Sequence, residues 1–438
     1  REFSNVSRLF KSYPNFNLME KIQENIVTAD GIPLKISLAR AQRRSKIVAF
    51  MMVFPLLVFI VIAFIGPIAD MLLLSIDNSI VKKILPKSSE ALQNWDEFSG
   101  ELPGEAVFAA MVDEIKKAKA AKEHTKIGSR FNYESSGFSS LFRKAGRKVN
   151  KIKTPPFKEA LIKSDKRWGE IYTWQVIKQN TSRYTEGYYL AALDFKRQFA
   201  SGNIESLESK DSIYLKLFFR TIVLSSLITF LTFVIGFPLS YMLSTVSTRI
   251  SNILIIFVLL PFWTSLLVRT TSWIALLQQE GVINDFLVLV GFINEEGRLA
   301  MIHNATGTVV AMTHILLPFM ILPLFSVMKT IPKSYVRAAI SLGAHPWKAF
   351  WKVYFPNTGA GIGAGSILVF ILAIGYYITP ALVGGSSGTF ISNRIAYHIS
   401  SSLNWGLGSA IGVILLGIVL LFFVFYDRIV GINNMKLG

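Results

Sequence analysis

The chain has 438 residues, of which 51% are hydrophobic and 17% are charged, and it carries a formal net charge of +18. Soluble domains typically contain about 25% charged residues, so this chain has more apolar surface than one water-soluble core can bury. Cysteine is absent, which excludes disulfides and thiolate metal sites. Between residues 77 and 212 there are 24 Lys or Arg and 18 Asp or Glu, so most of the positive excess lies beside apolar segments. This placement is typical of membrane topology signals and argues against a nucleic-acid partner.

Six segments are predicted to span a membrane, because a bilayer core about 30 Å thick requires roughly 20 apolar residues in a helix. Five of them reach or approach this length without a charged residue: Ile47–Ala69, Thr221–Thr248, Ile250–Val268, Leu299–Met328 and Ile399–Tyr426. The uncharged stretch 357–393 is too long for one straight helix, and its apolar centre, Ile362–Val383, is the sixth. The sequence therefore predicts an all-α membrane protein, with the first span within 47–76 and the other five within 213–428.

The orientation of the spans follows from Lys and Arg in the short loops, which favour the cytoplasmic side. Such residues flank one set of span ends: Arg40, Arg43, Arg44, Lys46, Arg249, Lys329, Lys333, Arg337, Lys348, Lys352, Arg428 and Lys436. The opposite short loops hold several acids, among them Glu280 and Glu295. Both terminal segments, 1–46 and 429–438, are therefore predicted to be cytoplasmic. Within the basic segment 1–46, Leu34–Lys46 is expected either to lie along the cytoplasmic membrane surface, held by anionic lipid, or to be a solvated tail.

Residues 77–212 form a polar insert of domain size between the first two spans. A helix is predicted from Glu105, because Val107, Met111 and Ile115 recur every four residues and share one face. Aromatic residues from Trp168 onward can fill a small core. The basic stretch Arg143–Lys158 is interpreted as an exposed linker. The insert is predicted to lie outside the cytoplasm, where it serves either as a docking or lid domain for a partner or as a stabilising cap.

The loop 330–356 has the pattern of two short helices joined by a turn. Ala338 and Ala339 favour a helix with small side chains, and Gly343 allows a turn with little steric bulk. Pro346 suits the first turn of a second helix, which then presents Trp347 and other aromatic residues. A helix–turn–helix of this kind can sit in a groove of another protein while it remains packed on its own bundle.

This segment resembles the coupling-helix signature of importer permeases of the ABC class, which reads Glu-Ala-Ala, three residues, Gly-Ala, then a downstream Phe and Leu-Pro. The matching residues are Ala338, Ala339, Gly343, Ala344, Phe350 and Pro356. Arg337 stands where the family usually has Glu, so the salt bridge formed there in the family is not carried over to this chain.

Further motifs in the order of the chain are similar to those of the first permease subunit of spermidine/putrescine-type importers. They are Phe219-Arg-Thr-Ile-Val-Leu-Ser-Ser, Leu259-Leu-Pro-Phe-Trp-Thr-Ser, Gly281-Val-Ile-Asn, Leu316-Leu-Pro-Phe-Met, Tyr377-Ile-Thr-Pro-Ala-Leu-Val-Gly-Gly and Asn404-Trp-Gly-Leu-Gly-Ser-Ala. Together they cover nearly all of 216–426. The insert, with Leu102-Pro-Gly-Glu-Ala-Val, looks like that of a subgroup with an enlarged loop between the first two spans.

The resemblance implies a type I ABC importer permease in a bacterial inner membrane, which moves a small polar and cationic solute such as a polyamine or an opine inward. It implies a second permease subunit, two ATPase subunits and an extracytoplasmic solute-binding protein as partners. The chain lacks a Gly-x-x-x-x-Gly-Lys-Ser/Thr loop, so it is expected to be no enzyme and to hold no cofactor, with ATP and Mg bound by the ATPase subunits. The residues expected to contact an ATPase subunit are Arg337, Ala338, Ala339, Gly343, Ala344, Trp347 and Phe350.

Several residues within or beside the spans are candidates for a solute pathway. A charged residue deep in a span is costly, so Arg269 is interpreted as lining or shaping a cavity, with snorkelling to the outer boundary as the alternative. Aromatic side chains can hold a cation by cation–π contact or can belong to an interfacial belt; these are Trp263, Trp273, Tyr376 and Tyr377. His314 is interpreted as a hydrogen-bonded packing residue rather than a proton relay.

Two other classes of protein remain as alternatives at this point. A secondary transporter or channel would require ion-coupling acids within the spans, whereas Asp70 and Asp77 are almost the only acids near them. A membrane sensor would bind a ligand in its large extracytoplasmic loop and a signalling partner through its cytoplasmic loop. Retention of an ATPase subunit during purification discriminates the importer from both.

Overall fold

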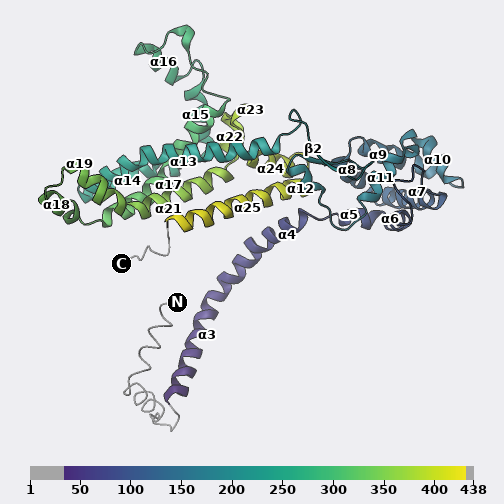
Figure 1. The fold of residues 1–438 in the computed structure, drawn as a ribbon, viewed down its shortest axis with the longest axis horizontal. Coiled ribbons are helices and arrows are strands. Elements are labelled where there is room, and N and C mark those ends of the chain that lie inside the picture. The colour runs from purple at the N-terminus through teal and green to yellow at the C-terminus, as the bar shows by residue number, and fades with distance from the viewer. Residues whose placement is uncertain (1–33, 431–438) are drawn as a thin grey trace. The chain divides into compact units, whose positions relative to one another are not determined.

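The computed structural model describes residues 34–430 and is almost entirely helical (Figure 1). The chain divides into two compact units, Arg1–Met71 and Leu72–Gly438. Within the first unit, α3 (Leu34–Ile60) continues through the π-helical turn η1 (Val61–Ile65) into α4 (Gly66–Leu74), whose last residues belong to the second unit. The predicted first span is thus one continuous helical segment, and residues 34–46 form its beginning. The rest of the N-terminal segment and residues 431–438 lie outside the described residues.

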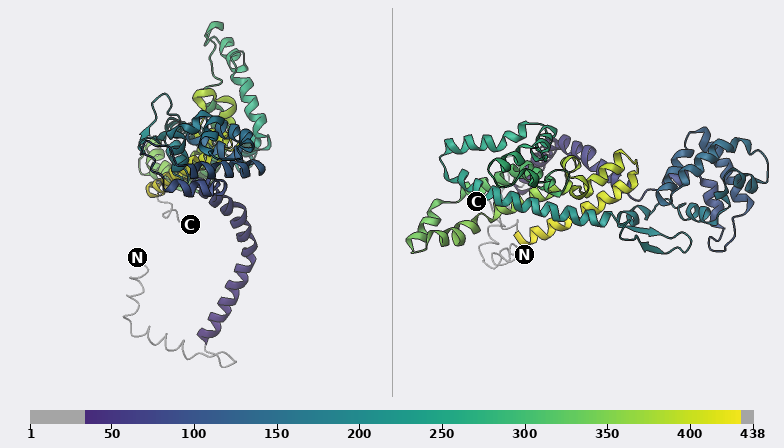
Figure 2. Two further views of the ribbon diagram at one scale, coloured as in Figure 1. Left: turned by 90° about the vertical axis from the view of Figure 1, so that its right-hand side faces the viewer. Right: turned by 90° about the horizontal axis from the view of Figure 1, so that it is seen from above.

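The second unit begins with the insert, whose helices form a compact group of their own (Figure 2). Its helices and strands are α5 (Ser79–Ile84), α6 (Pro86–Gln93), α7 (Glu105–Ala120), α8 (His124–Glu134), α9 (Phe138–Lys148), η2 (Val149–Lys151), α10 (Phe157–Ser164), η3 (Lys166–Gly169), α11 (Ile171–Gln179), α12 (Gly187–Ala192), β1 (Phe195–Arg197) and β2 (Ile204–Ser206). The two strands pair antiparallel, with Lys196 opposite Glu205. Apart from this small hairpin, the prediction of an all-α protein is confirmed.

The insert encloses a hydrophobic core rich in aromatic side chains. Val107, Met111 and Ile115 are at most 5% exposed on one face of α7, so the predicted helix and its buried face are confirmed. Trp168 and Trp174 are fully buried, and their ring centroids lie 5.5 Å apart. The aromatic residues of the sequence therefore do fill a core here.

The interpretation of Arg143–Lys158 as a linker is wrong for its first half, because α9 extends to Lys148. Phe138, Leu141, Phe142 and Ala145 form a buried stripe with helical spacing on α9. The basic residues of this helix lie outside that stripe. The charged run is therefore part of an amphipathic helix rather than of a linker.

The rest of the second unit contains the long apolar helices and the short elements between them. They are α13 (Tyr214–Thr245), α14 (Thr248–Trp263), α15 (Leu266–Leu277), α16 (Val282–Leu289), η4 (Glu295–Gly297), α17 (Ala305–Thr330), α18 (Lys333–Ser341), α19 (Pro346–Ala349), η5 (Phe350–Tyr354), α20 (Phe355–Asn357), α21 (Gly359–Gly375), α22 (Ile378–Val383), α23 (Gly385–Gly388), α24 (Ile391–Ser400) and α25 (Trp405–Val430). Within the described residues, four helices are long and apolar enough to cross a membrane. The number rises to six if each of two bent pairs is one span: Thr248–Trp263 with Leu266–Leu289, and Pro346–Asn357 with Gly359–Gly375.

Two predicted spans contain breaks. The predicted span Ile250–Val268 is divided at Thr264, where the segments Thr248–Trp263 and Leu266–Leu289 meet at 95°. The hydroxyl of Ser265 accepts a hydrogen bond from the Val268 amide at 3.1 Å and caps the new helix α15. The predicted span Ile362–Val383 is divided between α21 and α22, where the carbonyl of Tyr376 accepts a hydrogen bond from Ser392 at 2.6 Å. Polar side chains thus satisfy the backbone groups that each break releases.

Helices α13, α17 and α21 run side by side and form the core of the bundle (Figure 1). Leu316, Met320 and Leu324, spaced by four residues on α17, are fully buried. Gly365 of α21 lies against this row, because a Cβ atom at this position would be 2.8 Å from the sulfur of Met320 and 3.2 Å from its carbonyl oxygen. Small residues that allow such close approach are typical of packed membrane helices.

Asp194 connects the insert to the bundle at the start of α13. Its side chain is 2% exposed and accepts hydrogen bonds from the amides of Ile213, Tyr214 and Leu215 at 3.0, 3.1 and 2.7 Å. A carboxylate at a helix N-terminus satisfies free amides and interacts favourably with the helix dipole. This residue therefore fixes where and how α13 begins.

Candidate functional site

The loop between α17 and α21 has the helix–turn–helix form that its sequence predicts. Helix α18 ends at Ser341, and Gly343 follows two residues later with a φ of 90°, which lies in the left-handed region. The amide of Gly343 donates to the carbonyl of Ile340 at 2.9 Å, and the amide of Ala344 donates to that of Ala339 at 3.0 Å. These two bonds form a Schellman motif, which requires a residue that tolerates positive φ. Glycine at this position therefore determines the direction in which α19 leaves the turn.

The outer surface of this loop presents exposed apolar side chains. Leu342 is 89% exposed and Trp347 is 68% exposed, and Tyr335 and Ile340 are also exposed. Among the residues predicted to contact a partner, Arg337 and Ala338 are exposed, while Ala339 and Ala344 are half-buried. Large apolar side chains gathered at one exposed turn are typical of a protein interaction site.

Phe350, the other residue of this predicted set, has a different place because it faces the bundle. Its ring lies 6.3 Å from that of Phe237 and 5.8 Å from that of Tyr241, both on α13, and 5.7 Å from that of Tyr354. Trp347 stacks on Phe350 at 6.4 Å with an interplanar angle of 25°. The exposed turn is thus connected to α13 through a continuous stack of aromatic rings.

The residues predicted to line a solute pathway divide into two groups. Trp273 of α15 donates a hydrogen bond from Nε1 to Nδ1 of His314 on α17 at 3.1 Å. Arg269, one helical turn before Trp273, is close enough to interact electrostatically with His314 and with Tyr376. Its Nε atom is buried and has no hydrogen-bond acceptor within the described residues. Trp273 is thus bonded to His314, and Arg269 lies near both His314 and Tyr376; we call these four residues the polar cluster.

The other two predicted pathway residues lie apart from the polar cluster. Trp263, at the end of α14, is 75% exposed and has no ring contact or hydrogen bond through its side chain within residues 34–430. Tyr377 is 47% exposed, and its carbonyl oxygen accepts a hydrogen bond from the side chain of Asn393 at 2.7 Å. The break at Thr264 separates Trp263 from Trp273, although these positions are only ten residues apart in the sequence.

His314 is hydrogen-bonded, as its interpretation as a packing residue requires, but its position at the centre of the polar cluster was not expected. The sequence held one usable signal, the spacing of Arg269 and Trp273 by four residues, which places them on one face of a helix. Nothing in the sequence indicated that α17 would present a histidine to that face. Thr270 and Thr379, whose hydroxyls are 3.1 Å apart, hold α15 against α22 beside the cluster.

A second set of polar contacts lies where α24 meets the start of α13. The ring of His398 is 8% exposed, with Nε2 2.8 Å from the hydroxyl of Tyr214 and Nδ1 2.9 Å from that of Ser402. Burial, together with the positive charge of Arg394, lowers the pKa of His398 to about 4. The imidazole is therefore neutral near pH 7, and it acts as a hydrogen-bonding bridge rather than as a charge.

Comparison with known proteins identifies the chain's relatives. The profile of a family described as "Binding-protein-dependent transport system inner membrane component" matches residues 213–432. The spermidine/putrescine transport system permease protein PotB of Haemophilus influenzae is 31% identical over 215 residues, which are 49% of this chain and 74% of that protein. PotB of Escherichia coli is 28% identical over 226 residues, 52% of this chain and 82% of that protein. The inner membrane ABC transporter permease protein YdcU of Escherichia coli is 30% identical over 220 residues, 48% of this chain and 70% of that protein.

Among solved structures, a bacterial ABC transporter involved in the import of the acidic polysaccharide alginate matches with a TM-score of 0.43 and 17% identity, over 51% of this chain and 80% of the matched chain. The family match includes all the long apolar helices after the insert and the loop with Gly343, and its matched members are transport permeases rather than enzymes. The chain therefore belongs to the family of inner membrane components of binding-protein-dependent transport systems, as its coupling-helix motif predicted.

Proposed function

We propose that this chain is the permease subunit of an ATP-driven importer that moves a small polar cation, such as a polyamine or an opine, into the cytoplasm. The relatives named as spermidine/putrescine permeases support a polyamine-type solute. The scarcity of acidic residues near the spans supports a division of labour in which the solute-binding protein selects the ligand. In this proposal a second permease subunit completes the pathway, and two ATPase subunits bind ATP and Mg²⁺.

The observation that carries the proposal is the geometry of the loop 333–357. Leu342 and Trp347 are exposed beside a turn fixed by Gly343, while Phe350 is packed against α13. An ATPase subunit that takes the exposed side chains into a groove would move Phe350 and, through it, the bundle. Coupling is then mechanical, since ATP-driven closure of the partners shifts a loop that cannot move independently of the spans.

The test of this proposal is co-purification of the ATPase subunit with the permease. Leu342→Asp places a charge where an apolar contact is proposed, so we expect loss of most of the bound ATPase. Phe98→Asp is a matched control, because Phe98 is an apolar side chain of the insert that is also exposed, at 56%. Retention of the ATPase by Leu342→Asp, or equal loss in both variants, would show that this loop is not the contact.

Arg337 adds a charged interaction to this proposed contact. Because it replaces the acid usual in the family, we propose that it pairs with an acidic residue of the ATPase groove. Arg337→Glu should therefore weaken assembly several-fold, and an unchanged yield of complex would remove this refinement without affecting the role of Leu342.

The orientation that we propose places both termini and the loop 330–356 in the cytoplasm and the insert outside it. The positions of Lys and Arg in the short loops support this orientation. Since the chain contains no cysteine, a single cysteine introduced at Lys126 in the insert can be labelled without background. We expect a membrane-impermeant thiol reagent added to intact cells to label it. Labelling only after the inner membrane is opened would show that the topology is the reverse of the one proposed.

For the pathway itself we propose that the polar cluster forms part of the wall, with the rings of Trp273 and Tyr376 available for cation–π contact. Arg269 would repel a cationic solute, so its proposed role is to fix the shape of the wall rather than to bind. We therefore expect Trp273→Leu to reduce uptake while the ATPase remains bound, which separates this role from that of the loop.

A further inference from the structure

The positive charge of the insert is concentrated in one part of it. Residues 138–170 contain ten Lys or Arg and three Asp or Glu, which gives a net charge of +7. The rest of 77–212 contains 14 Lys or Arg and 15 Asp or Glu, which gives −1. The whole positive excess of the insert therefore belongs to α9, α10 and the segments beside them. These residues precede residue 213, where the family match begins, so the charge is a feature of the insert and not of the permease core.

Five of these basic residues line one hollow of about 470 Å³ at the ends of α9 and α10. They are Lys144, Arg147, Lys148, Lys163 and Lys166, and all five are exposed; we call them the basic patch. Lys148 donates a hydrogen bond from Nζ to the carbonyl of Ser164 at 2.8 Å. This bond joins the end of α9 to the end of α10, so the two helices present their basic side chains at one fixed site.

Little of this charge is neutralised by the insert itself. The one acid in the lining is Asp165, whose side chain is 8% exposed and lies 3.2 Å from Lys144 and 2.8 Å from Arg167. Within residues 34–430, the side chains of Arg147, Lys163 and Lys166 have neither an ion pair nor a hydrogen bond. Folding therefore leaves most of the positive charge of the basic patch unpaired.

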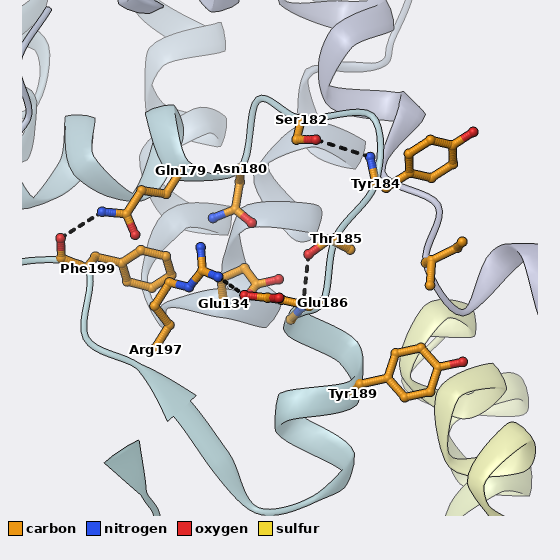
Figure 3. A pocket seen from close by; sticks show the side chains of 12 residues that line it. Glu134, Gln179, Asn180, Ser182, Tyr184, Thr185, Glu186, Tyr189, Arg197 and Phe199 are labelled. Atoms are coloured by element: carbon orange, nitrogen blue, oxygen red, sulfur yellow. Dashed lines mark hydrogen bonds and ion pairs between the residues drawn. The ribbon is translucent and has the colours of Figure 1, made fainter. Parts of the chain in front are cut away.

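Another hollow of the insert shows the opposite arrangement. In the hollow of about 410 Å³ beside α12, Arg197 forms an ion pair with Glu186 (Figure 3). The second carboxylate of that lining, Glu134, is paired with Arg130 at 2.8 Å. The charges are thus matched where the insert satisfies its own polar groups, and they are unmatched at the basic patch.

Stabilisation of the helix ends accounts for only part of the basic patch. Basic residues in the last turn of a helix interact favourably with its dipole, and Arg147, Lys148 and Lys163 occupy such positions. Lys153 and Lys166, however, lie beyond the ends of α9 and α10. The positive charge gathered here therefore exceeds what the two helices use.

The exposure of the basic patch indicates the kind of partner that it fits. Small-molecule sites typically bury most of the surface of their ligand, whereas the five side chains of the patch are exposed. Exposed charges of one sign attract a surface of the opposite sign over several ångströms and guide its approach. An acidic face of a protein therefore fits the patch better than a small anion does.

We propose that the basic patch docks an acidic face of the importer's solute-binding protein. The family match to binding-protein-dependent systems supplies this partner, and the proposed orientation places the insert on the side from which the partner approaches. In these two respects the proposal rests on the proposed function. It gives the insert the role of a docking domain rather than that of a stabilising cap.

The test is the association of the solute-binding protein of the same importer with the assembled importer in phosphatidylcholine nanodiscs, measured by surface plasmon resonance. Arg147→Glu combined with Lys166→Glu reverses two charges of the basic patch and should weaken binding about five- to ten-fold, mainly through slower association. High salt should slow association with the unmodified importer about ten-fold. Lys166→Gln alone, at a position outside both helices, should weaken binding about two-fold.

Two controls separate charge from other effects. Arg183→Glu combined with Lys210→Glu changes the same residue types at exposed loop positions of the insert outside the patch, and it should bind as the unmodified importer does. Arg147→Lys combined with Lys166→Arg keeps both charges and should also bind normally. The proposal is overturned if the first control weakens binding as much as the reversal in the patch, if the charge-conserving exchange weakens it equally, or if salt has no effect.

An anionic membrane surface is the other partner to exclude. Vesicles that contain phosphatidylglycerol should bind the unmodified importer and the reversal variant equally. Loss of vesicle binding in that variant, with unchanged binding of the solute-binding protein, would assign the basic patch to lipid and overturn the proposal.

The same preparations distinguish this proposal from the proposed function. The reversal variant should retain its ATPase subunit, because the patch lies in the insert and not in the loop 333–357. Failure of the solute-binding protein to respond to the patch while the ATPase remains bound counts against the docking surface alone. Retention of the ATPase by Leu342→Asp counts against the proposed coupling alone.

Discussion

The insert and the helical bundle satisfy their buried polar groups in different ways. In the insert, Glu114 is 3% exposed and accepts hydrogen bonds from the amides of Lys87 and Ser88, which belong to another helix, at 2.5 and 3.0 Å. In the bundle, the buried hydroxyl of Thr221 donates to the carbonyl of Leu217 on its own helix at 2.7 Å.

Asp165 also joins separate segments of the insert, because Arg167 and Lys144 of α9 both bond to its carboxyl. These bonds hold the pKa of the carboxyl well below its usual range. Thr270 repeats the local pattern of the bundle by donating to Leu266 of its own helix at 2.9 Å. Charged side chains therefore hold distant segments of the insert together. In the bundle, hydroxyl groups donate within their own helix and some also meet a neighbouring helix, as Thr270 meets Thr379, and the helices pack closely. Substitutions should consequently act through different mechanisms in the two regions.

The largest effect is expected from the aromatic core of the insert. Trp168→Ala removes a fully buried ring, and such truncations typically cost about 3–5 kcal/mol. We expect the insert to become susceptible to protease at temperatures where the unmodified chain resists cleavage. Trp347→Ala is the control, because this ring is 68% exposed; equal susceptibility of both variants would contradict the assignment of Trp168 to a packed core.

The packing of the bundle is tested by a pair of glycines. Gly365→Ala forces a methyl group against Met320, at 2.8 Å from its sulfur, and overpacking of this kind typically costs about 1–3 kcal/mol. Gly412→Ala in α25 meets no atom within 4 Å, so it should stabilise its helix by about 0.5–1 kcal/mol. Thermal unfolding in detergent should show shifts of opposite sign, and shifts of the same sign would refute the close approach of α17 and α21.

The contact between α24 and the start of α13 should respond to pH. His398 has a folded-state pKa of about 4, below the value of about 6.5 expected when it is unfolded. The unfolded chain therefore binds more protons between these values, so stability is complete above pH 6.5 and falls as the pH is lowered toward 4. The drop in melting temperature from pH 7 to pH 5 should be smaller in His398→Gln than in the unmodified chain. His345→Gln, at an exposed histidine of the loop, should leave the drop unchanged.

The last prediction concerns the turn of the loop 333–357, where the effect on assembly should exceed the effect on melting temperature. Gly343→Ala places a side chain at a φ of 90°, which costs about 1–2 kcal/mol locally. Because the turn is exposed, we expect little change in melting temperature but a several-fold weaker complex with the ATPase subunit. Gly359→Ala, in open space at the start of α21, is the control; equal weakening in both variants would mean that the direction of the turn is not important.

The same contrast explains which features the sequence could predict. Hydropathy located the long helices because length and the absence of charge are sufficient signals, and the coupling motif located the turn because Gly343 has a conformational role. The breaks after Trp263 and Gly375 were not predicted. The break after Gly375 is stabilised by Ser392 and Asn393, which lie on another helix, whereas Ser265 at the first break is a local cap that the apolar run of the sequence did not reveal. Three of the five pathway candidates meet, but His314 joins them through a contact between helices that no local pattern encodes.

The length of α13 has a further consequence, because this single helix joins two sites that lie far apart in the sequence. Its first amides are held by Asp194 of the insert, and Phe237 and Tyr241 near its other end touch Phe350 of the loop with Gly343. The 27 residue steps from Tyr214 to Tyr241 correspond to about 40 Å at 1.5 Å per residue. Helix α13 is therefore one continuous connection between the two sites, and its internal proline, Pro238, lies at the end that touches the loop.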